Sequence, residues 1–369
     1  MRVAILGCGY VANMYRLTLP LHPGLELAGV HDRERSRSET MARLTGTRAY
    51  ESLDALLADD APIVLNLTNP REHYETTRAL LEAGRHVYTE KPVAMDLGEA
   101  KALTALAAER SLHLVSAPCT LMSPAAQTLW RALREGRAGP VRLAYAEMDD
   151  GPVPFAPWPR WINEAGTAWP GADEFETGCA VEHAGYVLTW ACAMFGPARR
   201  VTASTHTLLP EKIEGQYLAP RDDFSVAVIE FASGPVLRLT NGIYAEHDHR
   251  LRLFGDEGVL SVDDPRSDDS PVRLARYRTL RRRRYLAKPE TLDPVGGAER
   301  ITAYRGSQTR DFCRVIADMA EAIEAGRAPY VGADLSLHVT ELTLACQGIV
   351  SDGSPYEVTT SFAPVEPLS

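Results

Sequence analysis

Cysteine is scarce in this chain, and its six copies are scattered. They occupy positions 8, 119, 179, 192, 313 and 346, and no two of them form a CxxC pair. This spacing indicates neither a disulfide framework nor a thiolate zinc cluster. The chain also lacks an apolar run of about 18 residues, and its first stretch, MRVAILGCGY, is too short and glycine-rich for a signal peptide. The sequence therefore predicts a cytoplasmic protein with no membrane partner.

Positive charge is also in short supply. Lysine and arginine together number 39 against 49 aspartates and glutamates, so the net charge is −10. Such a chain offers no electrostatic attraction for nucleic acid or for a membrane surface. Its one arginine run, 281–284, is more typical of a solvated or interface strand. Because 369 residues exceed what one hydrophobic core usually supports, we expect two domains, at 1–120 and 121–369.

Strand and helix patterns alternate through the first domain. Short apolar runs such as RVAILG, LELAGVHD, PIVLNLT, RHVYTE and LHLVSA have the pattern of strands, and helix-compatible segments separate them. Asp96 and Glu99 form a capping pair for a helix expected over 97–109. This alternation predicts an α/β Rossmann domain with a parallel, doubly wound sheet.

The pattern changes after Pro118. Ser123 and Pro124 mark the start of a helix, and another is expected over about 180–194. The runs FSVAVIEF, VLRLTNGIY and RLRLFG alternate apolar and polar residues, so we expect an α+β domain with an open, largely antiparallel sheet. Two late amphipathic helices have apolar faces made by Phe312, Val315, Ile316, Met319 and Ile323 and by Leu335, Val339, Leu342, Cys346 and Ile349.

The stretch GCGYVA follows the first strand and precedes a helix. Gly7 would permit a tight turn, and Gly9 would let the backbone approach a pyrophosphate at the helix N-terminus. Asp32 ends the second strand, where a carboxylate accepts hydrogen bonds from ribose hydroxyls and repels a 2′-phosphate. The predicted cofactor is NAD. NADP stays open, because Arg33 could contact a phosphate or stack on adenine.

A lysine at the end of a strand that otherwise looks buried is unusual. Lys91 has this position in TEKPVA. Ligands of parallel sheets bind beyond the carboxyl ends of the strands. We therefore expect Lys91 at the edge of the cofactor crevice, where its ammonium could contact a substrate hydroxyl or carbonyl.

These motifs resemble those of one family. Besides GCGYVA, the stretches TNPREHYETTRALLEAGRHVYTEKPVA, SPAAQTLWRALREGRAGPV and RLFGDEGVLSV look like landmarks, in their usual order, of the glucose-fructose oxidoreductase / inositol 2-dehydrogenase / rhizopine-catabolism (Gfo/Idh/MocA) oxidoreductases. The resemblance covers nearly the whole chain. It implies an NAD(P)-dependent oxidoreductase acting on CH–OH groups, with Lys91 as catalytic lysine. Further cofactor-binding residues that it implies are Tyr10, Val11, Ala12, Thr68, Asn69, Pro70, His73, Glu90 and Lys91 itself.

Members of this family commonly show an Asp-x-Gly-x-His-x-x-Asp pattern on a later helix. Here GCAVEHAGYVLTW aligns with Glu182 at the first acid, Ala184 at the glycine, Tyr186 at the histidine and Thr189 at the last acid. Tyrosine at the histidine position resembles the branch with dihydrodiol dehydrogenases and some nucleotide-sugar ketoreductases. Tyr186 is the expected acid/base, with Glu182 orienting it. A packed aromatic is the bland alternative, and His183 is the alternative base.

Weaker signals surround this candidate site. Trp161 and Trp169 belong to a tryptophan-rich loop and could stack on a sugar ring or cover the site, although core filling explains them equally well. Cys119 could border the nicotinamide pocket, with an inert buried thiol as the plainer explanation. His247 and His249 could point from one strand face as metal ligands. No third ligand is evident, and no metal is predicted.

The sequence thus predicts hydride transfer between nicotinamide and a carbinol or keto carbon. The resemblance implies a sugar, cyclitol or sugar derivative as substrate and a homodimer or homotetramer formed through the open sheet. Two other functions stay open. One is NAD-dependent glycoside cleavage through transient oxidation, and the other is a cofactor-binding regulator without catalysis.

Overall fold

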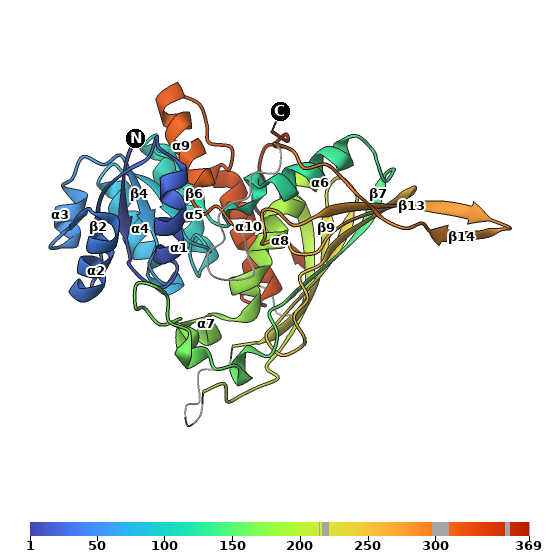
Figure 1. Cartoon of the computed structure of the whole chain (residues 1–369), viewed down its shortest axis with the longest axis horizontal. Coiled ribbons are helices and arrows are strands. Elements are labelled where there is room, and N and C mark those ends of the chain that lie inside the picture. The colour runs from blue at the N-terminus through green and yellow to red at the C-terminus, as the bar shows by residue number, and fades with distance from the viewer. Residues whose placement is uncertain (214, 216–220, 297–309, 351–354, 369) are drawn as a thin grey trace. The chain divides into compact units, whose positions relative to one another are not determined.

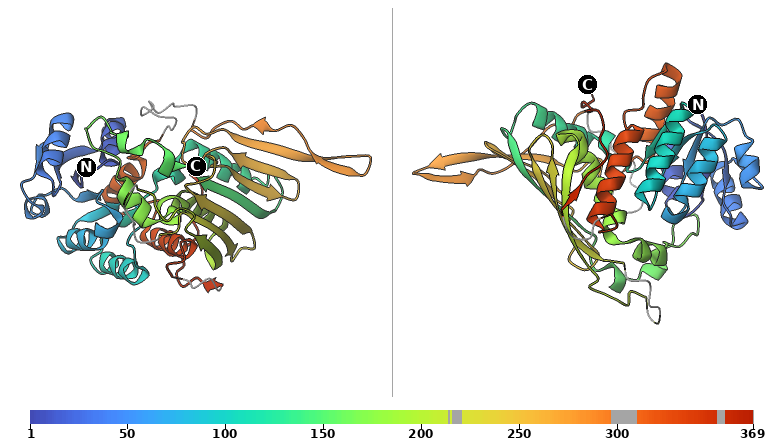
Figure 2. Two further views of the ribbon diagram at one scale, coloured as in Figure 1. Left: turned by 90° about the horizontal axis from the view of Figure 1, so that it is seen from below. Right: turned by 180° about the vertical axis from the view of Figure 1, so that it is seen from behind.

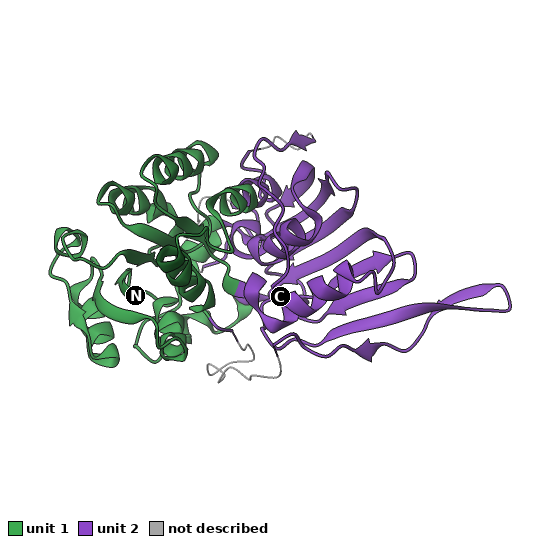
Figure 3. Ribbon diagram, turned by 90° about the horizontal axis from the view of Figure 1, so that it is seen from above, with its two compact units in different colours: residues 1–119, 155–177, 312–340 green, residues 120–154, 178–311, 341–369 purple. Residues whose placement is uncertain are grey.

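The chain folds into two compact units in its computed structural model, which describes residues 1–213, 215, 221–296, 310–350 and 355–368. Unit 1 comprises residues 1–119, 155–177 and 312–340, and unit 2 comprises residues 120–154, 178–311 and 341–369 (Figure 3). The domains expected from the sequence are continuous stretches. Unit 1 instead gathers three separate segments.

A six-stranded parallel sheet forms the centre of unit 1. Its strand order, β3-β2-β1-β4-β5-β6, is that of a dinucleotide-binding fold, with the order reversing between β1 and β4. The predicted parallel sheet is confirmed. Its strands are nearly continuous apolar runs because helices cover both faces. They are β1 (Arg2–Leu6), β2 (Glu26–His31), β3 (Arg48–Ala49), β4 (Ile63–Asn66), β5 (His86–Thr89) and β6 (Leu114–Ser116).

Helices alternate with these strands along the chain (Figure 1). The predicted cap is confirmed: Asp96 Oδ1 accepts a hydrogen bond from Glu99 N at 3.0 Å, a contact worth about 1 kcal/mol. The helices of unit 1 are α1 (Ala12–Thr18), α2 (Arg35–Thr45), α3 (Leu53–Leu57), α4 (His73–Glu82), α5 (Leu97–Glu109), α7 (Gly171–Thr177) and α9 (Arg314–Ala325). The last helix, α10 (Ala333–Cys346), begins in unit 1 and ends in unit 2.

Unit 2 is built on a ten-stranded sheet. Its strand order is β14-β13-β12-β11-β7-β10-β9-β8-β16, with β15 paired to β13. The pairings are antiparallel apart from that of β7 with β10, so the expected open, largely antiparallel sheet is confirmed. The strands are β7 (Val141–Asp149), β8 (Ala198–His206), β9 (Phe224–Phe231), β10 (Val236–Gly242), β11 (Leu251–Gly255), β12 (Gly258–Val262), β13 (Val272–Leu280), β14 (Arg283–Leu286), β15 (Glu290–Thr291) and β16 (Tyr356–Glu357).

Two helices, α6 (Pro124–Arg134) and α8 (Cys179–Phe195), lie against one face of this sheet (Figure 2). The strands alternate buried and partly exposed residues, as expected when only one face is covered. The predicted cap of α6 is confirmed, because Ser123 Oγ accepts a hydrogen bond from Ala126 N at 3.1 Å. The hairpin of β13 and β14 extends from the sheet and carries the arginine run 281–284, which is exposed. Among the described residues, no helix is long and apolar enough to cross a membrane.

Candidate functional site

The glycine loop after β1 has the geometry that its sequence predicts. Gly7 has φ +95°, and a Cβ placed there would lie 2.6 Å from the carbonyl carbon of Leu67. Only glycine fits so close to the chain that leaves β4. A Cβ at Gly9 would meet no atom within 4 Å, so the backbone there is open to a close approach. This arrangement fits a pyrophosphate-binding loop.

Asp32 directly follows β2 and is hydrogen-bonded to this glycine loop. Its Oδ2 accepts a hydrogen bond from Cys8 N at 2.7 Å, and its Oδ1 accepts one from Glu34 N at 2.7 Å. The carboxylate is therefore fixed in the folded chain, and each oxygen retains a lone pair for a ribose hydroxyl. Arg33 is exposed and lies 3.7 Å from a carboxylate oxygen of Glu72. Such exposed pairs hold a side chain only weakly.

Hydrogen bonds of Glu90 shape the turn after β5 that carries Lys91. Tyr15 donates a hydrogen bond from its hydroxyl to Glu90 Oε1 at 2.5 Å, and Lys91 N donates to Glu90 Oε2 at 3.2 Å. Burial and the Glu90 charge raise the pKa of Tyr15 well above its usual value, so the phenol keeps this proton. The Lys91 side chain is partly buried. Glu90 therefore positions the turn that presents the lysine.

His73 braces the same turn from α4. Its Nδ1 lies 2.6 Å from Pro92 O and its Nε2 lies 3.0 Å from Thr68 O, and the ring is fully buried. Burial lowers the pKa of His73, which favours the neutral ring. A neutral ring has one N–H and so donates to one of these two oxygens at a time. In this structure His73 links the loop after β4 to the loop after β5.

The tryptophan-rich segment belongs to unit 1. Asn163 Nδ2 donates to Tyr10 O at 3.1 Å, and Asn69 Nδ2 donates to Asp173 Oδ2 at 2.6 Å. Two of the predicted cofactor residues, Tyr10 and Asn69, are thereby tied to it. The rings of Trp161 and Trp169 are 5.2 Å apart between centroids and both are partly exposed. They pack on one another and still present surface to a ligand.

The remaining residues predicted in unit 1 follow the carboxyl ends of strands of the parallel sheet along the chain. Thr68 donates from Oγ1 to Asn66 Oδ1 at 2.7 Å, which holds the start of the loop that contains Pro70. Val11 precedes α1, and Ala12 is its first residue and is buried. Cys119 follows β6 with a buried side chain, at the end of the first segment of unit 1.

In unit 2, helix α8 carries the predicted proton-transfer residues. Every residue of this helix is buried except His183 and Tyr186, which are partly exposed. Glu182 is buried on the same helix. The hydroxyl of Tyr186 accepts a hydrogen bond from Arg310 Nη1 at 3.1 Å, and the guanidinium carbon of Arg310 lies 4.8 Å from the ring centroid. The phenol therefore keeps its own O–H available for donation.

His183 has a carboxylate partner that sequence reasoning missed. Its Nε2 lies 2.7 Å from Asp150 Oδ2, while Asp150 Oδ1 receives both His249 Nε2 and Arg266 Nη1 at 2.7 Å. Burial raises the pKa of the Asp150 carboxyl, but the charges of His183 and Arg266 and these hydrogen bonds outweigh burial and hold it well below its usual value. Asp150 is thus ionised and orients His183.

The missed residues had little signal in the sequence. Asp150 directly follows β7, in the doublet Asp149–Asp150, and a carboxylate at a strand end was the only cue. Arg266 and Arg310 lie in irregular segments with no motif around them. Asp150 is also the third neighbour of His247 and His249 that the sequence did not reveal.

Two family models match this chain in successive segments. Residues 1–117 match a model described as an oxidoreductase family with NAD-binding Rossmann fold (Gfo/Idh/MocA), and residues 126–261 match the GFO/IDH/MocA C-terminal domain. UDP-N-acetylglucosamine 3-dehydrogenase of Acidithiobacillus ferrooxidans is 33% identical over 42% of this chain and 47% of its own. Trans-1,2-dihydrobenzene-1,2-diol dehydrogenase of Oryctolagus cuniculus is 24% identical over 71% of this chain and 75% of its own.

Solved structures have the same fold. An NAD binding oxidoreductase from Klebsiella pneumoniae superposes with a TM-score of 0.78 at 20% identity, over 98% of this chain and 99% of its own. A 3-ketoreductase from Actinomadura kijaniata, solved with TDP-benzene and NADP, has a TM-score of 0.69 at 21% identity, over 94% and 96%. With both of its characteristic domains matched along most of its length, this chain belongs to the Gfo/Idh/MocA family of NAD-binding oxidoreductases.

Proposed function

We propose that this oxidoreductase acts on a hydroxyl or keto group of a sugar, cyclitol or nucleotide-linked sugar. The observation that carries the proposal is the exposure pattern of α8, where the only residues that are not buried, His183 and Tyr186, both have side chains able to exchange a proton. Carbinol oxidation needs such a group beside the carbon that loses hydride. Two relatives are named for nucleotide-sugar chemistry, a UDP-N-acetylglucosamine 3-dehydrogenase and a dTDP-3,4-didehydro-2,6-dideoxy-alpha-D-glucose 3-reductase.

The nicotinamide, when bound, exchanges a hydride with the substrate carbon. Gly7, Gly9 and Asp32 are proposed to hold the dinucleotide, with NAD preferred because Asp32 would face a 2′-phosphate as a like charge. Lys91 is proposed to donate a hydrogen bond to the substrate oxygen. Its ammonium would stabilise the negative charge that develops there during hydride transfer.

Tyr186 is proposed to exchange the substrate proton. Arg310 donates to the phenol oxygen and so stabilises charge on that oxygen when the proton leaves. His183 is the alternative, because Asp150 holds Nε2 and its buried Nδ1 has no hydrogen-bond partner among the described residues. The same carboxylate would stabilise an imidazolium formed on His183.

A panel of sugars, cyclitols and nucleotide sugars, each incubated with NAD⁺ and with NADP⁺, tests the substrate class. We expect reduced nicotinamide to accumulate, by absorbance, with at least one member of the panel. Products of glycoside cleavage without net cofactor reduction would contradict net oxidation. Tight cofactor binding without any turnover across these substrates, in either direction, would contradict the proposed substrate class.

A homodimer or homotetramer in the cytoplasm is part of the same proposal. The open face of the sheet in unit 2 carries Tyr145, Phe254 and Arg238, residue types that are common in protein interfaces. The rings of Tyr145 and Phe254 are 5.0 Å apart, and the guanidinium of Arg238 lies 4.2 Å from the Tyr145 centroid. Light scattering on wild-type protein and Tyr145→Glu tests it, and we expect the variant to dissociate.

A further inference from the structure

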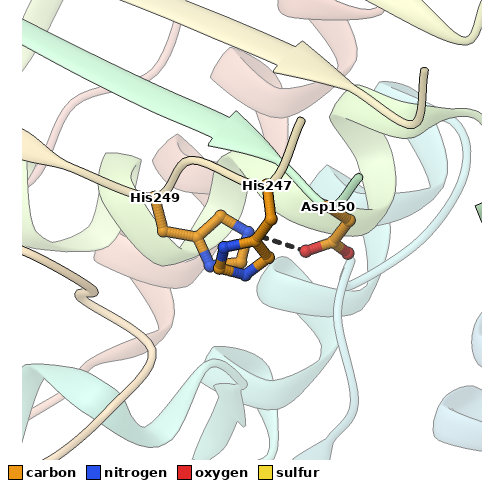
Figure 4. A group of neighbouring side chains, drawn as sticks. All are labelled: Asp150, His247 and His249. Atoms are coloured by element: carbon orange, nitrogen blue, oxygen red, sulfur yellow. Dashed lines mark hydrogen bonds and ion pairs between the residues drawn. The ribbon is translucent and has the colours of Figure 1, made fainter. Parts of the chain in front are cut away.

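An isolated β-bridge in unit 2 brings together three side chains of the types that bind metal ions. Asp149 and Asp248 form an antiparallel bridge, with reciprocal backbone hydrogen bonds of 3.0 and 2.9 Å. Because side chains alternate along extended chains, residues flanking such a pair point to the face opposite it. Asp150, His247 and His249 are three of the four flanking residues. Figure 4 shows the two imidazole rings beside the carboxylate.

The donor atoms are close enough to converge on one ion. One nitrogen of each histidine and one oxygen of Asp150 all lie within 4.8 Å of one another, and the two ring centroids are 4.1 Å apart. In a tetrahedral zinc site, donors at about 2.0–2.2 Å from the ion are separated by about 3.3 Å. His249 Nε2 and Asp150 Oδ1, now 2.7 Å apart, would separate slightly. His247 is exposed, so its ring can turn inward without disturbing the core.

Two of these three side chains have a further polar group behind them. His249 is buried, and its Nδ1 lies 3.4 Å from Asp264 Oδ1, within ion-pair range but without hydrogen-bond geometry. Asp150 Oδ2 is held by His183. Carboxylates behind ligating histidines, and hydrogen bonds behind ligating carboxylates, are the usual means of orienting metal ligands.

One charge in the cluster opposes cation binding. Arg266 Nη1 contacts Asp150 Oδ1 at 2.7 Å, so an ion there shares this carboxylate oxygen with a guanidinium. Asp150 Oδ1 has two lone pairs, so it can accept from Arg266 and bind the ion at the same time, provided that it no longer accepts from His249 Nε2. The repulsion between the two cations weakens binding. We expect an affinity below that of closed, four-ligand structural zinc sites.

We propose that Asp150, His247 and His249 form a binding site for one divalent transition-metal ion of the zinc class. Two imidazoles and one carboxylate suit zinc and its neighbours, whereas magnesium prefers oxygen ligands alone. Three protein ligands leave a fourth position for water or for a substrate oxygen. The site goes beyond the proposed function, because hydride transfer between the substrate carbon and nicotinamide, with Lys91 and Tyr186 acting at the substrate oxygen, requires no metal.

Titration of chelator-treated, full-length protein with Zn²⁺, Co²⁺ and Mg²⁺ tests the site. By calorimetry we expect one Zn²⁺ or Co²⁺ per chain and no binding of Mg²⁺. The visible bands of bound Co²⁺ should be those of nitrogen and oxygen ligands, and the near-ultraviolet thiolate charge-transfer band that cysteine ligation would produce should be missing. All six cysteines are buried and none forms a disulfide in this structure, so a thiolate band would overturn the assignment.

The decisive variant is His247→Ala, because His247 is exposed and its removal leaves the fold intact. The matched control is His206→Ala, an exposed histidine on β8 of the same unit. We expect His247→Ala to weaken Co²⁺ binding at least about tenfold and His206→Ala to leave it unchanged. Equal binding by wild type and His247→Ala, or no stoichiometric binding by wild type, would overturn the proposal. Absence of oxidoreductase activity would leave these titrations unaffected, so the two proposals fail separately.

Discussion

His183 Nε2 and Asp150 Oδ2 lie 2.7 Å apart, although 33 residues separate them in the chain. On the same helix, three residues further on, Tyr186 accepts its hydrogen bond from Arg310. Helix α8 therefore carries two side chains that are candidates for proton transfer, one paired with an anion and the other with a cation. Substituting each of the two residues in turn distinguishes their roles.

Tyr186→Phe keeps the ring and removes the hydroxyl. If the phenol exchanges the substrate proton, turnover should fall by about 10²-fold or more. The melting temperature should change little, because the hydroxyl accepts a single hydrogen bond from Arg310 in a partly exposed position. Steady-state kinetics on the best substrate of the panel and thermal unfolding measure the two effects. A variant with wild-type turnover would show that Tyr186 is only a packed aromatic.

His183→Ala examines the alternative base. With Tyr186 as acid/base, we expect this variant to retain turnover within about tenfold of wild type, because it disturbs only the neighbouring network. If instead it loses about 10²-fold or more while Tyr186→Phe stays active, the imidazole held by Asp150 is the proton carrier. Should both variants stay active, α8 would only line the substrate. Lys91 or solvent would then move the proton.

Asp32→Ser should reduce the preference for NAD. The carboxylate would repel a 2′-phosphate, so wild-type protein is expected to bind NAD⁺ more tightly than NADP⁺. Serine removes the charge, and the ratio of the two dissociation constants should narrow by about tenfold, or about 1.4 kcal/mol. Titration by intrinsic fluorescence measures both constants. Loss of the hydrogen bond from Cys8 N to Asp32 should in addition weaken the binding of both cofactors by a common factor, which does not alter the ratio.

Arg33→Ala serves as the companion variant. Arg33 is exposed and only weakly paired with Glu72, so its loss should leave NAD⁺ affinity nearly unchanged. Tighter binding of NADP⁺ than of NAD⁺ by wild type, abolished in Arg33→Ala, would mean that the arginine and not Asp32 selects the cofactor. Asp54→Ser, at an exposed aspartate of α3, controls for the general effect of removing a negative charge.

His86 should make unit 1 sensitive to acid. Its Nδ1 accepts a hydrogen bond from His113 N at 2.9 Å, and its ring stacks on that of His113 at 5.1 Å. Burial and the His113 charge lower the pKa of His86 from 6.5 to about 4. Between these values the unfolded chain binds a proton that the folded chain does not. Stability is therefore lost as the pH falls through this window.

The free energy of unfolding is expected to fall by on the order of 1 kcal/mol. This is less than the full pKa shift would give, because His86 is partly exposed and solvent screens its charge. His86→Asn retains an acceptor near Nδ1 and cannot titrate, so its unfolding free energy should depend less on pH over this window. Urea unfolding at several pH values measures the slopes. Identical slopes for wild type and His86→Asn, with His206→Asn as the exposed control, would contradict the prediction.

Local patterns predicted the local structure well. Gly7 has the positive φ that its motif requires, and Asp96 and Ser123 cap the helices expected of them. The parallel and largely antiparallel sheets were both expected from hydrophobic periodicity. The capping contacts lie within three residues along the chain, and the glycine motif and the hydrophobic period are themselves local patterns, so a short stretch of sequence was enough for these predictions.

Contacts made by distant residues were not predictable in the same way. Asp150 reaches His249 across 99 positions because the register between Asp149 and Asp248 aligns them. No pattern around Arg310 indicates that it contacts Tyr186, 124 positions away. Likewise, Asn163 binds Tyr10 and thereby ties the tryptophan-rich segment to unit 1. These pairings depend on sheet register and loop packing, which a single sequence does not specify.

The turnover of Lys91→Ala is the most direct test of the account. Lys91 is proposed to polarise the substrate oxygen, so its loss should lower kcat by roughly 10²- to 10⁴-fold. The dissociation constant for NAD⁺ should change little, because the ammonium acts on the substrate. Lys101→Ala, at an exposed lysine of α5, is the matched control and should keep wild-type kcat. The account predicts a large, lysine-specific loss of kcat with cofactor binding intact, and wild-type turnover by Lys91→Ala would contradict it.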